Sequence, residues 1–210
     1  MKAIADCRLY GILDLGYVER AAISRMAADM IDGGIDLIQL RAKKSPADEI
    51  LAMGRELLPL TREAGVPFII NDHPEIAAEL GADGIHVGQD DLSMTEVRAI
   101  VGESMLVGRS THSIEQARGG AAEGADYLGF GPLFATPTKP DYVPIGIAEI
   151  AQVHAENPAL PIFCIGGIKR ENLSKVIAAG AKRVVIVSGI LQALDVAAYV
   201  RDVKVMLPAA

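Results

Sequence analysis

Short apolar runs recur along the whole chain, and segments with helical spacing separate them. The runs span 9–14, 36–41, 67–72, 84–89, 105–110, 126–132, 161–167 and 183–189. They are apolar nearly throughout instead of alternating with polar residues, which is typical of strands buried on both faces. The pattern therefore predicts eight buried strands.

The segments between these runs carry helix signals. In 19–34, apolar residues recur at helical spacing until Gly33-Gly34 end the pattern. In 45–65, Ser45 is the expected N-cap, and Gly65 ends the helix. No low-complexity tract divides the chain, so residues 1–210 are expected to form one domain.

Strands that alternate with helices in this number predict an α/β fold, a single compact (β/α)8 TIM barrel. Its active site is expected at the C-terminal ends of the strands. The alternative is a doubly wound open sheet. We favour the barrel because no GxGxxG motif follows the first run and the number of repeats matches.

Composition and sequence signals argue against nucleic-acid and membrane partners. The chain has 20 basic and 27 acidic residues, a formal charge of −7, which argues against nucleic acid but not against small anions bound locally. Cys7 and Cys164 are too few for a disulfide framework. No targeting signal and no apolar run near ~20 residues is seen. We expect no membrane partner and a cytoplasmic location, and a homo-oligomer is left open.

Two consecutive runs within 68–91 end on carboxylates, at Asn71-Asp72 and at Gln89-Asp90-Asp91. Neighbouring strands lie roughly 5 Å apart. Two carboxylates about 4 Å apart repel by about 4 kcal/mol at an effective dielectric near 20. Protonation of one carboxylate would remove this repulsion, and so would a bound cation, for which the oxygen ligands fit Mg²⁺. The alternative, that Asp72 and Asp91 cap the following helices, stays open on the sequence alone.

Two further features suggest phosphate binding. Gly166-Gly167 and Ser188-Gly189 end the last two runs, where barrels often bind phosphate through backbone N–H groups, although ordinary glycine turns are the alternative. The loop 132–144 holds four prolines, two threonines and one lysine. We interpret it as a lid that grips phosphates, with a plain surface loop as the alternative.

Cations lie at the end of the second run. Arg41 and Lys43 are alternate residues and project to the same side of an extended chain, whereas Lys44 points away. Together with Lys139 they suit a diphosphate. A salt bridge from Arg41 to a neighbouring helix is the alternative.

The four histidines differ in their expected roles. His73 and His154 are expected at the surface, and His86 is expected to be a hydrogen-bonded histidine inside the barrel. His112 follows Ser110 at the rim and is a candidate acid–base group.

Six motifs, in order, resemble the thiamine phosphate synthase family over about residues 9 to 194: LIQLRAKK, IIND, GADGIHVGQDDL, GADYLGFGPLFATPTK, IGGI and VIVSGI. The resemblance implies a Mg²⁺-dependent transferase on a (β/α)8 barrel. Such an enzyme joins hydroxymethylpyrimidine diphosphate to hydroxyethylthiazole phosphate and yields thiamine phosphate and diphosphate. The path is a dissociative substitution, which needs no protein nucleophile.

The resemblance also implies roles for individual residues. Asp72 and Asp91 would be the Mg²⁺ ligands, and the residues expected to act in catalysis are Arg41, Lys43, Ser110 and Lys139. The pyrimidine diphosphate would be held by Gln39, Arg41, Lys43, Asn71, Ser110 and Lys139. The thiazole phosphate would be held by Thr136, Pro137, Thr138, Gly167, Val187 and Ser188.

The chain departs from the family pattern at some positions. Ala42 stands where an acidic residue is usual, and Leu13 precedes Asp14 where a threonine is frequent. Arg-Ser-x-His also recurs in the related thiazole tautomerases, so an isomerase that uses His112 is the first alternative function. A non-catalytic phosphate-ligand binder is the second. The acid pair and the TPTK lysine favour the synthase.

Overall fold

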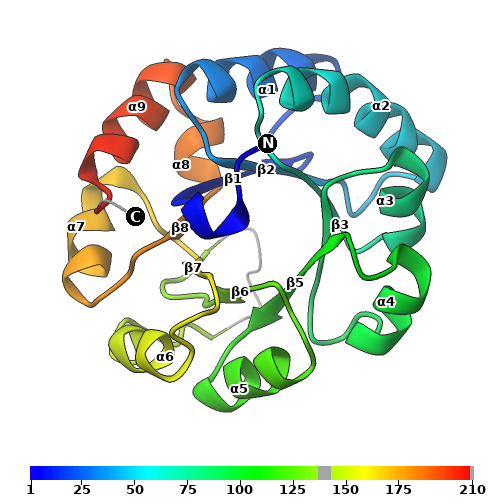
Figure 1. Ribbon diagram of the computed structural model, residues 1–210. Coiled ribbons are helices and arrows are strands. Elements are labelled where there is room, and N and C mark those ends of the chain that lie inside the picture. Colours follow the sequence, from blue (N-terminus) through cyan, green and yellow to red (C-terminus); the bar gives the residue numbers. More distant parts are fainter. Residues whose placement is uncertain (137–142, 209–210) are drawn as a thin grey trace.

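The computed structural model describes residues 1–136 and 143–208. Over these residues eight parallel strands close into a barrel in the order of the sequence, with β1 paired to β8 (Figure 1). The strands are β1 Leu9–Asp14, β2 Leu37–Arg41, β3 Phe68–Asn71, β4 Gly84–Val87, β5 Leu106–Thr111, β6 Tyr127–Phe130, β7 Ile162–Cys164 and β8 Val184–Ile186. The predicted barrel is confirmed, and most strands are shorter than the apolar runs.

Helices surround this barrel (Figure 1). They are α1 Ile23–Asp32, α2 Ala47–Glu63, α3 Pro74–Leu80, α4 Met94–Val101, α5 Ile114–Ala122, α6 Ile150–Glu156, α7 Arg170–Ala178, α8 Ser188–Leu191 and α9 Val196–Met206. Two short 3-10 helices, η1 Ile4–Asp6 and η2 Arg20–Ala22, precede β1 and α1. None of the helices in the described residues is long and apolar enough to cross a membrane.

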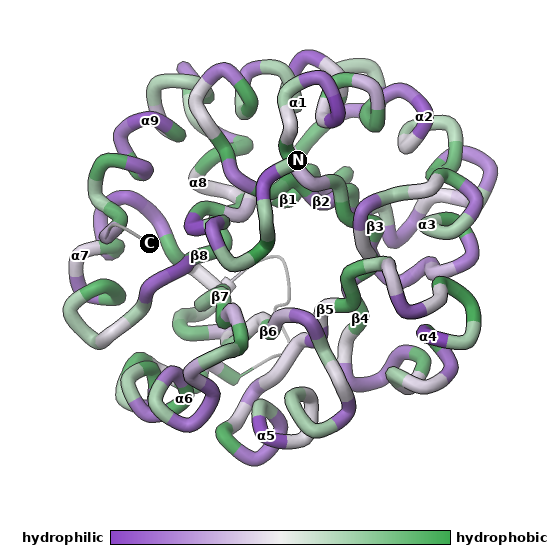
Figure 2. Tube along the Cα trace, in the orientation of Figure 1, coloured by the Kyte–Doolittle hydropathy of each residue, from purple (hydrophilic) through white to green (hydrophobic). Residues whose placement is uncertain are grey.

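Side chains alternate between the two faces of each strand. On β1, Leu9 and Leu13 join the outer apolar layer beneath the helices, whereas Tyr10 and Ile12 belong to the smaller cluster inside the barrel. Strand positions are correspondingly apolar around the barrel, while polar residues recur along the helices (Figure 2). This burial on both faces explains why the strands read as uninterrupted apolar runs.

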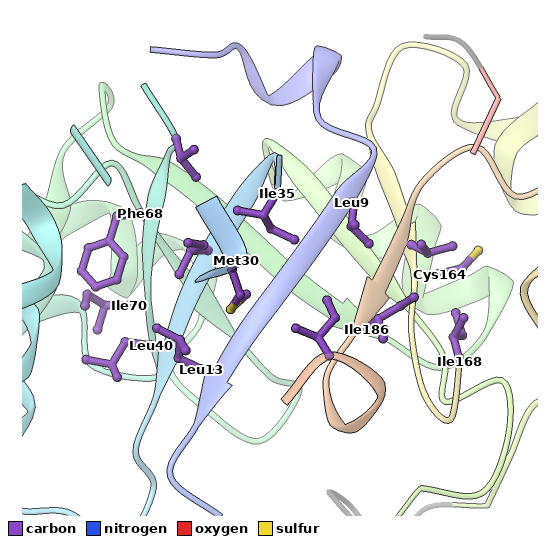
Figure 3. Packing of buried hydrophobic residues seen from close by; sticks show 14 of the residues in the cluster. Leu9, Leu13, Met30, Ile35, Leu40, Phe68, Ile70, Cys164, Ile168 and Ile186 are labelled. Carbon is purple, nitrogen blue, oxygen red and sulfur yellow. The ribbon is translucent and has the colours of Figure 1, made fainter. Parts of the chain in front are cut away.

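The outer layer is packed closely against β1 (Figure 3). A Cβ atom added at Gly11 would lie 2.1 Å from the Met30 side chain and 3.2 Å from that of Ile35. Glycine at this position therefore lets α1 approach the strand. The contact fixes β1, whose last residue, Asp14, reaches the rim of the barrel.

Aromatic rings fill the inside of the barrel. Tyr10, Tyr127 and Phe163 meet edge to face, with centroids 5.4 to 6.1 Å apart. All three are almost fully buried. This layer is part of the packed interior beneath the C-terminal strand ends.

Two local predictions are wrong. Pro46, not Ser45, occupies the N-cap position of α2, and no side chain caps that end. His154 is buried, at 8% exposure, because α6 turns Ile150, Val153 and His154 toward the barrel. These positions are spaced i, i+3, i+4, which is the buried stripe of a helix.

Candidate active site

The polar strand ends surround one pocket at the C-terminal end of the barrel. Every predicted site residue that the structure describes lines it: Gln39, Arg41, Lys43, Asn71, Asp72, Asp91, Ser110, Thr136, Gly167, Val187 and Ser188. Pro137, Thr138 and Lys139 lie outside the described residues. The side chains thus come together as expected, and their individual roles stay predictions.

Asp72 and Asp91 form the acidic side of the pocket, and Lys43 accompanies them. The Lys43 Nζ atom lies 3.0 Å from Asp72 Oδ2. Burial raises the pKa of the Asp72 carboxyl above its usual range, Lys43 opposes the change, and the charge of Asp91 and a hydrogen bond with its carboxyl add to it. One lysine therefore does not compensate the pair fully, and a further cation would stabilise the charged form of both acids.

Neither aspartate caps a helix. Asp72 has a φ of 64°, in the left-handed region, and the His73 N–H closes this turn on the Asn71 carbonyl. The N-cap of α3 is His73, without a side-chain cap. The Asp91 carboxylate accepts the Gly88 N–H at 2.6 Å. The capping alternative is therefore wrong for both residues.

The cap of α4 is a separate group of residues. Ser93 and Glu96 form a reciprocal capping box at its first turn. The first turn of α4 therefore does not need Asp91 as a cap, and Asp91 lines the pocket.

Arg41 is held by the neighbouring strand. Its Nη1 atom donates to Asp14 Oδ2 at 2.6 Å, and Asp14 Oδ1 accepts the Gly16 N–H at 2.8 Å. The predicted alternative, a salt bridge from Arg41 to a helix, is thus replaced by a salt bridge between strand ends. The expected orientation is confirmed, because Arg41 and Lys43 line the pocket while Lys44 is exposed and does not.

The opposite rim consists of two interlocked loops. Leu133 N–H and Phe134 N–H donate to the carbonyls of Ile165 and Gly166. A Cβ atom at Gly166 would lie 2.4 Å from Pro132, and one at Gly167 would lie 2.7 Å from the Ala135 carbonyl oxygen. Both glycines have positive φ, 98° and 64°. They are required for loop packing, and this packing places Thr136 and Gly167 on the same pocket wall.

The loop after β8 completes this rim. Val187 and Ser188 line the pocket where α8 begins. A Cβ atom added at Gly189 would lie 2.6 Å from the Tyr199 hydroxyl of α9, so glycine here lets α9 pack against this turn. Phosphate binding by the backbone of this loop stays a prediction.

Both barrel histidines line the pocket. His86 contacts Ser110 Oγ through Nε2 at 2.9 Å and the Tyr127 hydroxyl through Nδ1 at 3.2 Å, as expected for a hydrogen-bonded interior histidine. The Nδ1 atom of His112 donates to the Gly131 carbonyl, which fixes the ring at the pocket edge. The His112 N–H also donates to Gln116 Oε1 at 2.7 Å.

The apolar part of the pocket was not predicted from the sequence. Its lining includes Tyr10, Ile12, Phe163, Ile165 and Ile168. The alternation of strand side chains could have found the first two, because Tyr10 and Ile12 share the inward parity of Asp14. The pocket therefore combines apolar side chains with the polar strand ends.

The donor set fits Mg²⁺ better than a transition metal. Among the described residues, no three His, Cys, Asp or Glu side chains gather in a way that could hold an ion by themselves. Mg²⁺ is usually bound by one or two carboxylates and completed by water and substrate phosphates. Asp72 and Asp91 would supply that number.

The fold and pocket define a class: a (β/α)8-barrel protein with a polar pocket at the C-terminal ends of its strands. Residues 9–190 match the family model described as thiamine monophosphate synthase. A thiamine-phosphate synthase of Pelotomaculum thermopropionicum is 40% identical over 99% of this chain and 95% of its own length. One of Halalkalibacterium halodurans is 44% identical over 91% of this chain and 90% of its own. The chain belongs to the thiamine monophosphate synthase family, and the predicted family membership is confirmed.

Solved structures agree. Thiamine phosphate pyrophosphorylase from Pyrococcus furiosus superimposes with a TM-score of 0.87 at 28% identity, over 97% of this chain and 96% of that one. The pyrophosphorylase of Bacteroides thetaiotaomicron, at 16% identity and a TM-score of 0.69, shares the fold. Membership of the thiamine monophosphate synthase family places the chain among transferases.

Proposed function

We propose that this protein joins 4-amino-2-methyl-5-(diphosphooxymethyl)pyrimidine to hydroxyethylthiazole phosphate and releases diphosphate. The observation that carries the proposal is the arrangement of one pocket: two carboxylates with Arg41 and Lys43 on one side, and Gly167 with Ser188 on the other. The first side suits a diphosphate with a divalent cation, and the second suits a monophosphate. The family relationship supports the same reaction.

The leaving group is stabilised on the acidic side. When the bond from the pyrimidine methylene carbon to oxygen breaks, negative charge develops on the diphosphate. Arg41 and Lys43 face this charge from fixed positions, since Asp14 and Asp72 hold them. Preorganised charge of this kind gives a large catalytic contribution. A Mg²⁺ ion on Asp72 and Asp91 would supply additional charge neutralisation for the diphosphate oxygens.

The apolar wall serves the other half of the reaction. Ile12, Phe163 and Ile165 exclude water from the surface on which the two rings would meet. Water would otherwise compete with the thiazole nitrogen for the electron-poor pyrimidine carbon. None of these three side chains is a nucleophile, in accord with direct transfer between the substrates.

The test is a mixing experiment with both substrates and the purified protein. Thiamine phosphate is followed by thiochrome fluorescence, with Mg²⁺ or with EDTA. The proposal expects product with Mg²⁺ and none with EDTA. Equal product in both tubes would remove the metal from the proposal, and no product in either tube with folded protein would remove the synthase.

A thiazole tautomerase is the second candidate, because His112 lines the same pocket in a fixed orientation. His112→Ala separates the two functions. A tautomerase would lose its activity, whereas the synthase would keep most of its turnover because its charge stabilisation lies on other residues. As parts of the synthase function, we also propose a cytoplasmic location. We further propose that substrate is bound by Thr136, Pro137, Thr138 and Lys139.

A further inference from the structure

A continuous file of hydrogen bonds runs through the inside of the barrel beneath the pocket. We call it the interior chain. Gln39 Nε2 lies 2.6 Å from the Tyr10 hydroxyl, which lies 3.3 Å from the Tyr127 hydroxyl. The Tyr127 hydroxyl lies 3.2 Å from His86 Nδ1, and His86 Nε2 lies 2.9 Å from Ser110 Oγ. Gln39, Tyr10, His86 and Ser110 line the pocket, and Tyr127 does not.

Packing fixes the members of this chain. A Cβ atom added at Gly108 would lie 2.1 Å from the Tyr127 ring and 2.5 Å from His86 Nδ1. A Cβ atom added at Gly129 would lie at van der Waals distance, 3.5 Å, from His86 Cε1, so the strand backbone there borders the imidazole. Gln39, Tyr10 and Tyr127 are at most 2% exposed. Their hydrogen-bonding groups must therefore find partners within the protein.

Each link has a direction. A tyrosine hydroxyl has one proton, and burial raises the pKa of Tyr10 and Tyr127, so both keep that proton. The Gln39 amide nitrogen can only donate, so the Tyr10 proton is directed at Tyr127. The Tyr127 proton is then directed at His86 Nδ1. A neutral imidazole that accepts at Nδ1 carries its proton on Nε2 and donates from there.

We propose that the interior chain fixes His86 as the Nε2–H tautomer and thereby turns Ser110 into a hydrogen-bond donor toward the pocket. Ser110 Oγ accepts from His86, so its own proton is directed at the ligand. A donor suits an anionic diphosphate oxygen, so this part of the inference rests on the proposed function. With the Gln39 amide reversed, every link would reverse, and Ser110 would offer lone pairs instead. Tyr127 is thus a positioning residue that acts on the substrate through two others.

The first test is the tautomer in the free, unmutated protein. Nitrogen-15 spectra of histidine-labelled protein show which ring nitrogen carries the proton, and with four histidines the assignment by a His86→Gln variant is direct. The expected result is a proton on Nε2 of His86. A proton on Nδ1 would overturn the proposal. This measurement needs no substrate, so its outcome is independent of whether the synthase assay succeeds.

Tyr127→Phe tests the link that carries the effect. Without the Tyr127 hydroxyl, we expect His86 to sample both tautomers and the KM for the pyrimidine diphosphate to rise about 10-fold, with the KM for the thiazole phosphate unchanged. Tyr10→Phe is the matched control. It removes one hydroxyl from the same buried layer but leaves Tyr127 free to donate to His86, so the Nε2–H tautomer should persist.

A double-mutant cycle with Ser110→Ala completes the test. If Tyr127 acts through Ser110, Tyr127→Phe should raise the KM no further in the Ser110→Ala background. Fully additive effects would overturn the inferred route, even with an active synthase. A protein with the expected tautomer but no synthase activity would instead overturn only the proposed function.

Discussion

The two ends of the barrel each hold a largely buried aspartate beside lysine, with opposite results. At the N-terminal end, Asp36 accepts from Lys2 Nζ, Lys204 Nζ and the N–H groups of Arg8 and Leu9. Burial would raise its pKa, but these partners together lower it below the usual value. At the C-terminal end, Lys43 does not offset burial and Asp91, so the pKa of Asp72 is raised.

We propose that this difference separates a stabilising site from a functional one. Asp36 has its charge and its oxygens satisfied by the protein itself. Asp72 and Asp91 are held in a repulsive arrangement that a ligand would relieve, a pattern common where binding or catalysis occurs. Mutations of chemically similar size at the two ends should therefore affect different properties.

Asp36→Asn should have the largest effect on folding. It leaves Lys2 and Lys204 beside a neutral side chain, and removal of one partner from a buried ion pair costs roughly 3 kcal/mol of unfolding free energy. Lys2 is partly exposed, which keeps the expected value at the low end of the usual range. Urea unfolding measures it. A loss below about 1 kcal/mol would mean that the cluster contributes little.

Asp72→Asn should reduce turnover and leave the stability of the fold intact. Synthase turnover should fall by at least about 10²-fold, because the leaving diphosphate loses its charge stabilisation. The unfolding free energy should stay unchanged or rise slightly, because the repulsion with Asp91 disappears. Asparagine also tolerates the left-handed backbone of this position. Asp36→Asn is the matched control, with normal turnover in the folded fraction; normal turnover in Asp72→Asn would contradict the contrast.

The contacts at the C-terminal end of the barrel were more predictable from the sequence than those at the N-terminal end. Asp72 and Asp91 follow successive strands, so parallel pairing alone brings them together. Asp36 meets its lysines from 34 and 168 residues away in sequence. Such partners depend on how η1, the N-terminal segment and α9 pack, and no short spacing records that.

The hydrogen bonds inside the barrel were not predicted from the sequence, because they too depend on how distant elements pack. Buried strands produce apolar runs, so the barrel was predictable, but Tyr10 and Tyr127 read simply as apolar strand residues. Their hydrogen bonds depend on inward parity on β1 and β6 together, which only closure of the barrel reveals. His154 was mispredicted for a simpler reason, because the buried stripe of the seven-residue helix α6 was not followed.

His154 should make the free energy of unfolding depend on pH. Burial, together with the nearby charges of Lys182 and Arg183, lowers the pKa of His154 from 6.5 to about 4. The unfolded chain therefore binds this proton at a higher pH than the folded protein. Stability should fall as the pH decreases from 6.5 to 4, by up to about 3 kcal/mol. Urea unfolding at several pH values, with His154→Leu as comparison, measures this. An identical slope in both proteins would exclude His154 as the cause.

Asp14→Asn should have the smallest effect of these substitutions. It compares Asp14 with Asp72 at the C-terminal end of the barrel. Asp14 holds Arg41, and Asp72 holds Lys43. Asp14 is buried, at 3% exposure, and its carboxylate also accepts the Gly16 N–H. The asparagine side chain would keep one acceptor and lose the charge that orients the guanidinium. We expect kcat/KM for the pyrimidine diphosphate to fall about 10-fold, the value of one charge-assisted hydrogen bond. Arg41→Lys, which keeps the charge but not the planar fork, should cost at least as much. An unchanged or higher kcat/KM in Asp14→Asn would show that Asp14 competes with the diphosphate for Arg41 instead of positioning it.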